Sequence, residues 1–166
     1  KTNNTNFALL VSTRFTEPFN EPIEYGKYIA RLANMLTGGG VMVQRLGDVL
    51  KGRRTDYDRL KKSTTIPTLK SAVPGDLSYV LPARYLTSII ETLKAFDNIA
   101  PGIYARNTLL YGAEVKFYSS KVRVSNNFET DVRHLYAIGD GAGITRGLMQ
   151  ASVTGVAVAR DIAARI

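Results

Sequence analysis

LYAIGDGAGITRGLMQAS, residues 135–152, is the stretch of this sequence that says most about its fold. An apolar run leads into a glycine-rich turn, and a helix is expected to begin after that turn, near Gly147. Such a turn presents backbone N–H groups and the positive end of a helix dipole, which suit an anion or a polarised carbonyl group. Gly139, Gly141 and Gly143 would let a ligand approach the backbone closely. A tight turn that binds no ligand explains the same pattern, so that alternative stays open.

The turn does not match the dinucleotide-binding fingerprint GxGxxG. Counted from Gly141, the third glycine position is occupied by Arg146. The fingerprint also opens a βαβ unit of about 30 residues, with an acidic residue about 20 positions further on. Only nineteen residues follow Gly147, which is enough for one helix. Asp140 moreover places a carboxylate in the turn, which is unfavourable beside a pyrophosphate and well suited to sugar-like hydroxyl groups.

The segment ETDVRHLYAIGD resembles the second FAD motif of flavoproteins that have two dinucleotide-binding domains. The resemblance implies that Asp140 hydrogen-bonds the ribityl hydroxyl groups of FAD. It also implies that backbone amides from Arg146 to Met149 lie near the flavin carbonyl. The cofactor-binding residues implied in this way are Gly139, Asp140, Gly141, Thr145, Arg146, Gly147, Leu148 and Met149.

Three blocks narrow the resemblance to uncharacterised FAD-dependent dehydrogenases, which are often labelled NAD-utilising. The blocks are QRLGDVLKG at 44–52, GDLSYVLP at 75–82, and GAEVKFYSSKVRV at 112–124 through to GDGAGITRGLMQASVTGVAVAR at 139–160. In such proteins an N-terminal FAD fingerprint comes first, then an inserted substrate domain, then a C-terminal return to the FAD domain. The resemblance implies that this chain is the C-terminal portion of such an enzyme. Its partner would be the missing N-terminal FAD-binding half, and we expect the isolated chain to be inactive.

The expected fold class is α/β. A mixed helix–strand inserted domain of substrate type is expected over residues 1–105. The closing strand and helix of a Rossmann-like FAD domain are expected over 106–166. The expected strands lie at Phe7 to Val11 and near 108–111, 114–118, 121–125 and 134–138. The expected helices run from Asn20 to Gly38, from about Leu46 to Gly52, after Pro82 and from Gly147 onward, with an irregular connection over 63–81.

The sequence also indicates where the helices begin and end and which of their faces are buried. Asn20 is a candidate N-cap, Pro22 suits the first turn, and Gly38 suits a left-handed C-terminal position. Apolar residues repeat at helical spacing in each of the three long helices. The expected buried stripes are Tyr25, Tyr28, Ile29, Leu32, Met35 and Leu36; Leu86, Ile89, Ile90, Leu93 and Phe96; and Leu148, Ala151, Gly155, Ala159, Ile162 and Ile166. The small residues of the last stripe would let its backbone approach its neighbour closely.

Composition and charge exclude several classes of protein. The 166 residues contain no cysteine and one histidine, His134, so thiolate chemistry and a histidine-rich metal site are excluded, and we expect no metal. No apolar run approaches the roughly 20 residues of a spanning helix, so we expect no membrane partner and a cytoplasmic protein.

The net charge is +8, with six cations against two aspartates in KGRRTDYDRLKK at 51–62. We interpret this stretch as a solvated, partly self-paired surface. A basic nucleic-acid-binding module that uses residues 51–62, and a structural fragment without a ligand, are the alternatives.

Other candidate residues carry weaker signals, and none of them forms a nucleophile–base pair, so the catalytic residues stay unassigned. Thr145 is expected to cap the last helix. Arg146 is a candidate for the flavin pyrimidine edge, where a cation would stabilise an anionic reduced flavin, and a surface role is the alternative. Lys116, Tyr118 and Ser119 could line one side of a strand, and His134 is expected at the surface. The enzyme class implied is an FAD-dependent oxidoreductase that acts on a small-molecule substrate, with NAD(P)H as a candidate electron donor.

Overall fold

Helices and a small mixed sheet make up the fold, and the α/β class is confirmed. The computed structural model describes residues 3–116 and 121–165. Its longer helices are α1 (Pro22–Thr37), α4 (Ala83–Phe96) and α5 (Leu148–Ala163). The shorter helical elements are α2 (Leu46–Val49), α3 (Tyr57–Lys61) and the 3₁₀ turns η1 (Leu77–Tyr79) and η2 (Asp140–Ala142). The strands are β1 (Met42–Arg45), β2 (Val73–Pro74) and β3 (Leu109–Gly112).

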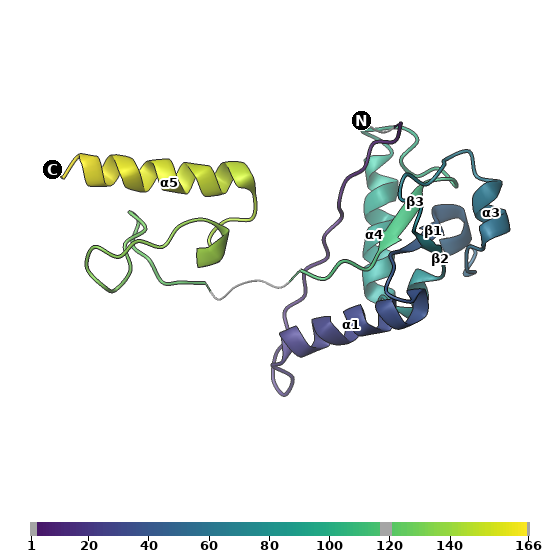
Figure 1. Cartoon of the computed structure of the whole chain (residues 1–166), viewed down its shortest axis with the longest axis horizontal. Coiled ribbons are helices and arrows are strands. Elements are labelled where there is room, and N and C mark those ends of the chain that lie inside the picture. Colours follow the sequence, from purple (N-terminus) through teal and green to yellow (C-terminus); the bar gives the residue numbers. More distant parts are fainter. Residues whose placement is uncertain (1–2, 117–120, 166) are drawn as a thin grey trace. The chain divides into compact units, whose positions relative to one another are not determined.

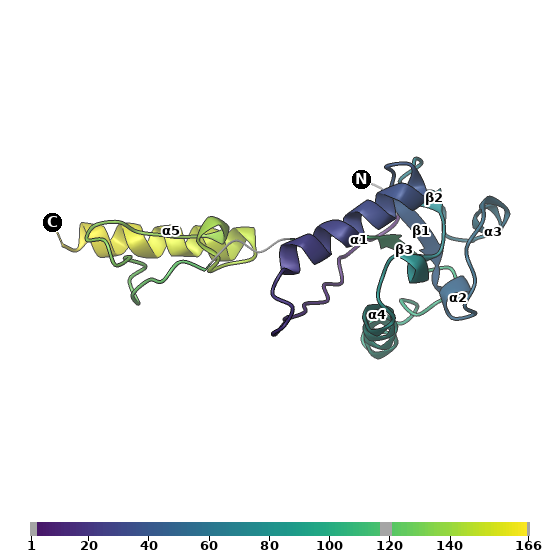
Figure 2. The same ribbon diagram turned by 90° about the horizontal axis from the view of Figure 1, so that it is seen from below.

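The sheet has the order β2-β1-β3 and joins segments that lie far apart in the sequence. β1 pairs in parallel with β2, with Met42 opposite Val73. It pairs antiparallel with β3, with Met42 opposite Gly112 and Arg45 opposite Leu109. Figure 1 and Figure 2 show α1 and α4 beside this small sheet. One apolar core joins these elements, formed by Ile29, Ala33, Met42, Leu77, Val80 and Leu86.

The helix α1 begins and ends close to where its sequence signals place it. Pro22 occupies the first helical position, and Gly38 adopts the left-handed conformation with φ 64° directly after Thr37. The expected cap at Asn20 is wrong. The N-cap position is Glu21, whose side chain makes no cap bond, and the Asn20 side chain donates to Glu17 Oε1 at 3.1 Å instead.

The face of α1 that is buried matches the expected stripe only in part. Ile29 is buried and Tyr25 and Leu32 are half-buried, but Tyr28, Met35 and Leu36 are exposed. The other buried residues of the helix are Gly26, Ala33 and Thr37. In α4 the expected face is better matched, since Leu86 and Leu93 are buried and Ile89 and Ile90 are half-buried, although Phe96 is exposed.

Several expected strands do not form among the described residues. Phe7, Leu10 and Val11 are exposed and pair with no strand, and the Phe7 ring lies 6.4 Å from the Phe96 ring. Residues 114–116 and 121–125 form no ladder, and 117–118 lie outside the described residues. The expected strand at 134–138 is reduced to one antiparallel bridge between Glu129 and Tyr136. A strand requires a neighbouring strand for its hydrogen bonds, and the described residues supply none at these places.

The chain divides into two units, Lys1–Lys116 and Phe117–Ile166. The sequence places the boundary near residue 105, just before the strand expected at 108–111. β3 pairs with β1 over four residue pairs, so residues 109–112 belong to the first unit. The second unit comprises α5 and the irregular segment 121–147, which runs beside the helix in Figure 1.

The buried face of α5 partly follows the expected stripe. Thr154 and Val158 are buried, and Ala151 and Gly155 are half-buried beside them. Leu148, Ala159 and Ile162 are exposed, and Ile166 lies outside the described residues. The opposite side of the helix carries Met149, Val153 and Val156, which are exposed too. A helix that is apolar on both sides is typical of one that is covered on both sides.

Candidate functional site

The glycine-rich turn is shaped by two residues in conformations that side chains rarely adopt. Gly139 has φ 69° and ψ −162°, a region that is almost exclusive to glycine. The 3₁₀ turn η2 follows, and Gly143 closes it in the left-handed conformation with φ 71°, its N–H donating to Asp140 O at 3.0 Å. The glycines at these two positions therefore determine the path of the chain around Asp140.

Small residues bring this turn close to α5. A Cβ atom at Gly139 would lie 3.6 Å from Ala151 Cβ, and one at Gly155 would lie 3.8 Å from Ile138 Cδ1. Ala151 and Gly155 therefore lie on the face of α5 that contacts the turn, whereas Ala159, the third small residue of the expected stripe, is exposed. The approach is fixed by a buried hydrogen bond in which Gly139 N donates to Thr154 Oγ1 at 3.1 Å. Thr154 was not predicted as a site residue, because its only signal in the sequence is a hydroxyl group between two small residues on the buried face of the helix.

Asp140 lies at the surface of the turn, and its carboxylate is held from within the same segment. Thr145 Oγ1 donates to Asp140 Oδ1 at 2.6 Å, and Thr145 is buried. The expected role of Thr145 as the cap of α5 is wrong, because Gly147 occupies the N-cap position and makes no side-chain cap bond. Thr145 instead orients the carboxylate that the sequence places at the centre of the site.

The first turn of α5 completes the site. The N–H groups that open a helix have no acceptor within the helix, and here they belong to Leu148, Met149 and Gln150. The side chains of Leu148 and Met149 are 89% and 77% exposed. Arg146 is exposed just before the helix, with Nη1 3.5 Å from Thr145 O. The backbone at Gly141 is open, since an added Cβ would meet nothing within 4 Å.

The eight sequence-predicted residues all lie within positions 139–149, the segment that leads into α5, and they are Gly139, Asp140, Gly141, Thr145, Arg146, Gly147, Leu148 and Met149. An exposed carboxylate, an accessible backbone and a helix N-terminus lie along this segment. Carboxylates accept hydrogen bonds from hydroxyl groups, and helix N-termini favour groups with negative or partial negative charge. The arrangement can therefore bind a ligand that carries both hydroxyl and carbonyl groups.

His134 lies at the surface of the preceding turn, as expected, in a left-handed conformation with φ 64°. Its backbone N–H donates to Glu129 Oε1 at 2.7 Å. This bond, together with Arg165, holds the pKa of Glu129 below its ordinary value. Of the three weaker candidates, Lys116 is exposed and lies 3.5 Å from Glu114, while Tyr118 and Ser119 lie outside the described residues.

The block QRLGDVLKG forms a buried polar network in the first unit. Asp48 is 1% exposed, accepting from Arg53 Nε at 2.8 Å and from the fully buried Thr55 Oγ1 at 2.9 Å. Gln44 is equally buried, with Nε2 donating to Arg53 O and Oε1 accepting from Leu77 N. These bonds tie β1 and α2 to the loop that follows and to η1. The role of this block is therefore to hold the first unit together.

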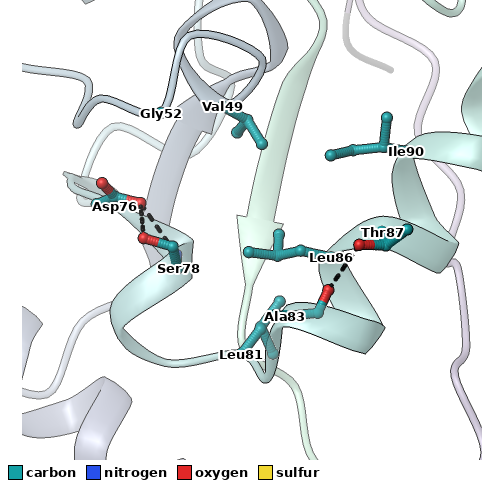
Figure 3. A pocket seen from close by; sticks show the side chains of 9 residues that line it. All are labelled: Val49, Gly52, Asp76, Ser78, Leu81, Ala83, Leu86, Thr87 and Ile90. Atoms are coloured by element: carbon teal, nitrogen blue, oxygen red, sulfur yellow. Dashed lines mark hydrogen bonds between the residues drawn. The ribbon is translucent and has the colours of Figure 1, made fainter.

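A pocket of about 260 Å³ lies between α2, η1 and α4. Val49, Leu81, Leu86 and Ile90 give it apolar walls, and Figure 3 shows Asp76 and Ser78 at one side. Asp76 Oδ1 accepts from both the N–H and the hydroxyl of Ser78, so the carboxylate holds the 3₁₀ turn. The pocket is an apolar hollow with a polar margin.

The basic stretch 51–62 is partly self-paired, as expected. Within the stretch, Arg59 Nη1 lies 2.8 Å from Asp56 Oδ2. Arg53 pairs with Asp48, which lies just before the stretch. Asp56 also caps α3 by accepting from Arg59 N, and this bond lowers the pKa of Asp56. The remaining cations of the stretch are exposed.

Two further properties bear on the class of site. Within residues 3–116 and 121–165, no group of three or more acidic or histidine side chains is placed to hold a metal ion. Among the helices in the described part of the chain, none is both long and apolar enough to cross a membrane.

Comparison with known proteins gives a partial match and no family assignment. No protein-family model matches this sequence. An uncharacterized protein of Clostridium beijerinckii (strain ATCC 51743 / NCIMB 8052) is 30% identical over 170 residues, which cover 96% of this chain and 31% of that protein. The chain therefore spans about a third of the length of the relative that it matches.

Proposed function

We propose that this chain contributes the ribityl and flavin end of the FAD site in an FAD-dependent oxidoreductase, a dehydrogenase of which it is the C-terminal part. The observation that carries the proposal is the turn at Gly139, which ends in the exposed carboxylate of Asp140 and leads into the N-terminus of α5. The resemblance of this segment to the second FAD motif supports the same assignment. The location that we propose for the enzyme is the cytoplasm.

The chemistry of the donor set fits one end of FAD. Asp140 would accept hydrogen bonds from the ribityl hydroxyl groups, with Thr145 keeping the carboxylate in place. The opening N–H groups of α5 would face a flavin carbonyl, and Gly141 leaves the backbone open to a close approach. The chain lacks a matching site for the pyrophosphate end of FAD, because no GxGxxG turn occurs in the sequence. The proposal therefore assigns the phosphates to an N-terminal FAD-binding half as the partner of this chain.

FAD, when bound, supplies the redox chemistry, exchanging a hydride or electrons with a small-molecule substrate or with NAD(P)H. The chain's own residues bind and orient it. Arg146 would place a positive charge near the pyrimidine edge, where negative charge develops on reduction. Leu148 and Met149 would cover apolar surface beside the helix N-terminus, since both are exposed there.

The second unit has the features of a segment that packs against another part of a longer protein. Among residues 121–165 the buried apolar side chains are Ala142 and Val158, whereas Met149, Val153 and Val156 are exposed along α5. A core this small contributes little hydrophobic stabilisation, and in the proposed parent protein further chain would cover the exposed apolar face of α5. That the similar clostridial protein is about three times as long as the aligned region supports a covering segment elsewhere in such proteins.

The proposal is tested by the affinity of the chain for FMN, which carries the flavin and the ribityl chain without the adenosine half. We expect Asp140→Ala to weaken binding by about tenfold to a hundredfold, because a charge-assisted hydrogen bond contributes roughly 1.5–3 kcal/mol. Asp140→Asn keeps one acceptor oxygen and should lose less. Asp131→Ala removes an exposed carboxylate from the same unit and serves as the control. Equal affinity of Asp140→Ala and Asp131→Ala would show that Asp140 is not the ribityl ligand.

The second candidate function is nucleic-acid binding through residues 51–62, which is favoured by the net charge of +8 and the exposed cations of that stretch. Binding of this kind depends on phosphate contacts and weakens steeply with salt. Specific binding of RNA or DNA that persists at physiological salt would favour this candidate over the flavin site.

A further inference from the structure

Thr154 lies in the middle of α5, and its hydroxyl group makes two hydrogen bonds. Its oxygen accepts from Gly139 N at 3.1 Å, and its proton is donated to Ala151 O at 2.7 Å. The residue is 6% exposed, and its bond with Gly139 N is buried. The second bond, within the helix, fixes the hydroxyl rotor so that a lone pair faces the turn.

The turn depends on this acceptor. Gly139 is buried and has the unusual backbone conformation described above, so its N–H lies outside any regular ladder. A buried N–H group without an acceptor costs roughly 1–3 kcal/mol. Thr154 removes that cost only when the turn holds its observed position against the helix.

We propose that Thr154 is a positioning residue that fixes the Gly139–Asp140 turn and, through it, the carboxylate of Asp140. Two threonines then hold the aspartate, with Thr154 fixing its backbone and Thr145 its side chain. Neither hydroxyl group needs to touch a ligand. The consequence for flavin binding rests on the proposed function, whereas the fixing of the turn does not.

Three substitutions separate this role from simple packing. Thr154→Val keeps the shape of the side chain and removes the hydroxyl group. Thr154→Ala also removes it but is a better helix former, which guards against failure of α5 to fold. Thr154→Ser restores the hydroxyl group. Thr87→Val is the matched control, because Thr87 likewise donates to a carbonyl of its own helix, Ala83 O, but accepts from no turn.

The ligand-independent readout is hydrogen exchange of the Gly139 amide in the full chain labelled with ¹⁵N-glycine. We expect Thr154→Val and Thr154→Ala to speed exchange at Gly139 by about tenfold or more, the equivalent of one lost hydrogen bond. Thr154→Ser should stay within about twofold of the unchanged chain, as should Thr87→Val. Unchanged exchange at Gly139 in both Thr154→Val and Thr154→Ala, or a loss in Thr154→Ser equal to theirs, would overturn the proposal.

The second readout is the affinity for FMN in the same variants. Weaker FMN binding by Thr154→Val, with recovery in Thr154→Ser, supports the inference that the hydrogen bond between Thr154 and Gly139 positions the carboxylate of Asp140. If the unchanged chain binds no FMN, the proposed function fails, and the exchange of Gly139 alone decides whether Thr154 fixes the turn. If FMN binds but its affinity is the same in all variants while Gly139 exchanges faster, Thr154 does not position Asp140 and the proposal is overturned.

Discussion

Replacing Asp48 by alanine should destabilise the first unit more than any surface substitution in the same region. The carboxylate is almost completely buried, and one of its partners, Thr55 Oγ1, is fully buried too. Without Asp48, that hydroxyl donor has no acceptor, at a cost of roughly 1–3 kcal/mol. The vacated volume adds about 1 kcal/mol. Arg53 is 44% exposed at its side chain, so its lost ion pair adds less than about 1 kcal/mol.

The expected total for Asp48→Ala is therefore about 2–5 kcal/mol, a large part of the stability of an ordinary domain. Urea unfolding followed by circular dichroism measures it, and the midpoint should fall by about 1 M or more. Asp58→Ala is the matched control, because Asp58 is exposed in α3 and its loss should cost under about 1 kcal/mol. If the two variants unfold at the same urea concentration, the buried network does not hold the unit together.

Two further predictions concern the second unit. Gly139→Ala should destabilise the turn by about 1–3 kcal/mol and weaken FMN binding, because a φ of 69° is strained for alanine. Gly141→Ala is the control: an added Cβ has open space there, so this variant should unfold at the same urea concentration as the unchanged chain. The pKa of Glu129 is lowered in the folded chain by the His134 N–H, so the stability that this bond adds is present above the unfolded pKa and is lost as pH falls through the folded pKa. The His134 amide resonance should titrate with a midpoint below 4.5, the ordinary pKa of a glutamate, and Glu129→Gln should abolish the titration.

The elements that the sequence predicts well are those with local signals. Pro22 and Gly38 delimit α1, Pro82 precedes α4, and Gly147 precedes α5, because helix ends depend on residues within one turn. The strand β1 was not predicted, since its partners lie about 30 and 70 residues further along the chain and no local pattern reveals them.

The expected strand at Phe7 to Val11 shows the converse error. An apolar run is consistent with a buried strand, but burial needs a neighbour, and here the run is exposed and forms no ladder. The same reasoning explains the single bridge that replaces the expected strand at 134–138. Apolar content alone therefore does not predict strands in this chain.

The part of the candidate site that the sequence predicts is the turn that its glycines indicate. Glycines on both sides of Asp140 indicate an unusual turn, and the structure forms one with Gly139 at positive φ. The bonds that hold it, from Thr145 to Asp140 and from Gly139 to Thr154, depend on how the turn folds back onto α5. Such contacts are set by tertiary structure, so the sequence assigned Thr145 to a cap and did not single out Thr154.

The most direct test of the flavin assignment is a ¹⁵N NMR titration of the chain with FMN, FAD and ADP in parallel. We expect FMN to cause shift changes confined to residues 139–149, with a Kd of roughly 0.1–1 mM, since only one end of the cofactor is bound. FAD should bind about as weakly as FMN, and ADP should cause no changes in this segment. Submicromolar binding of FAD, or FMN-induced changes that avoid residues 139–149, would contradict the assignment of this turn to the ribityl and flavin end of FAD.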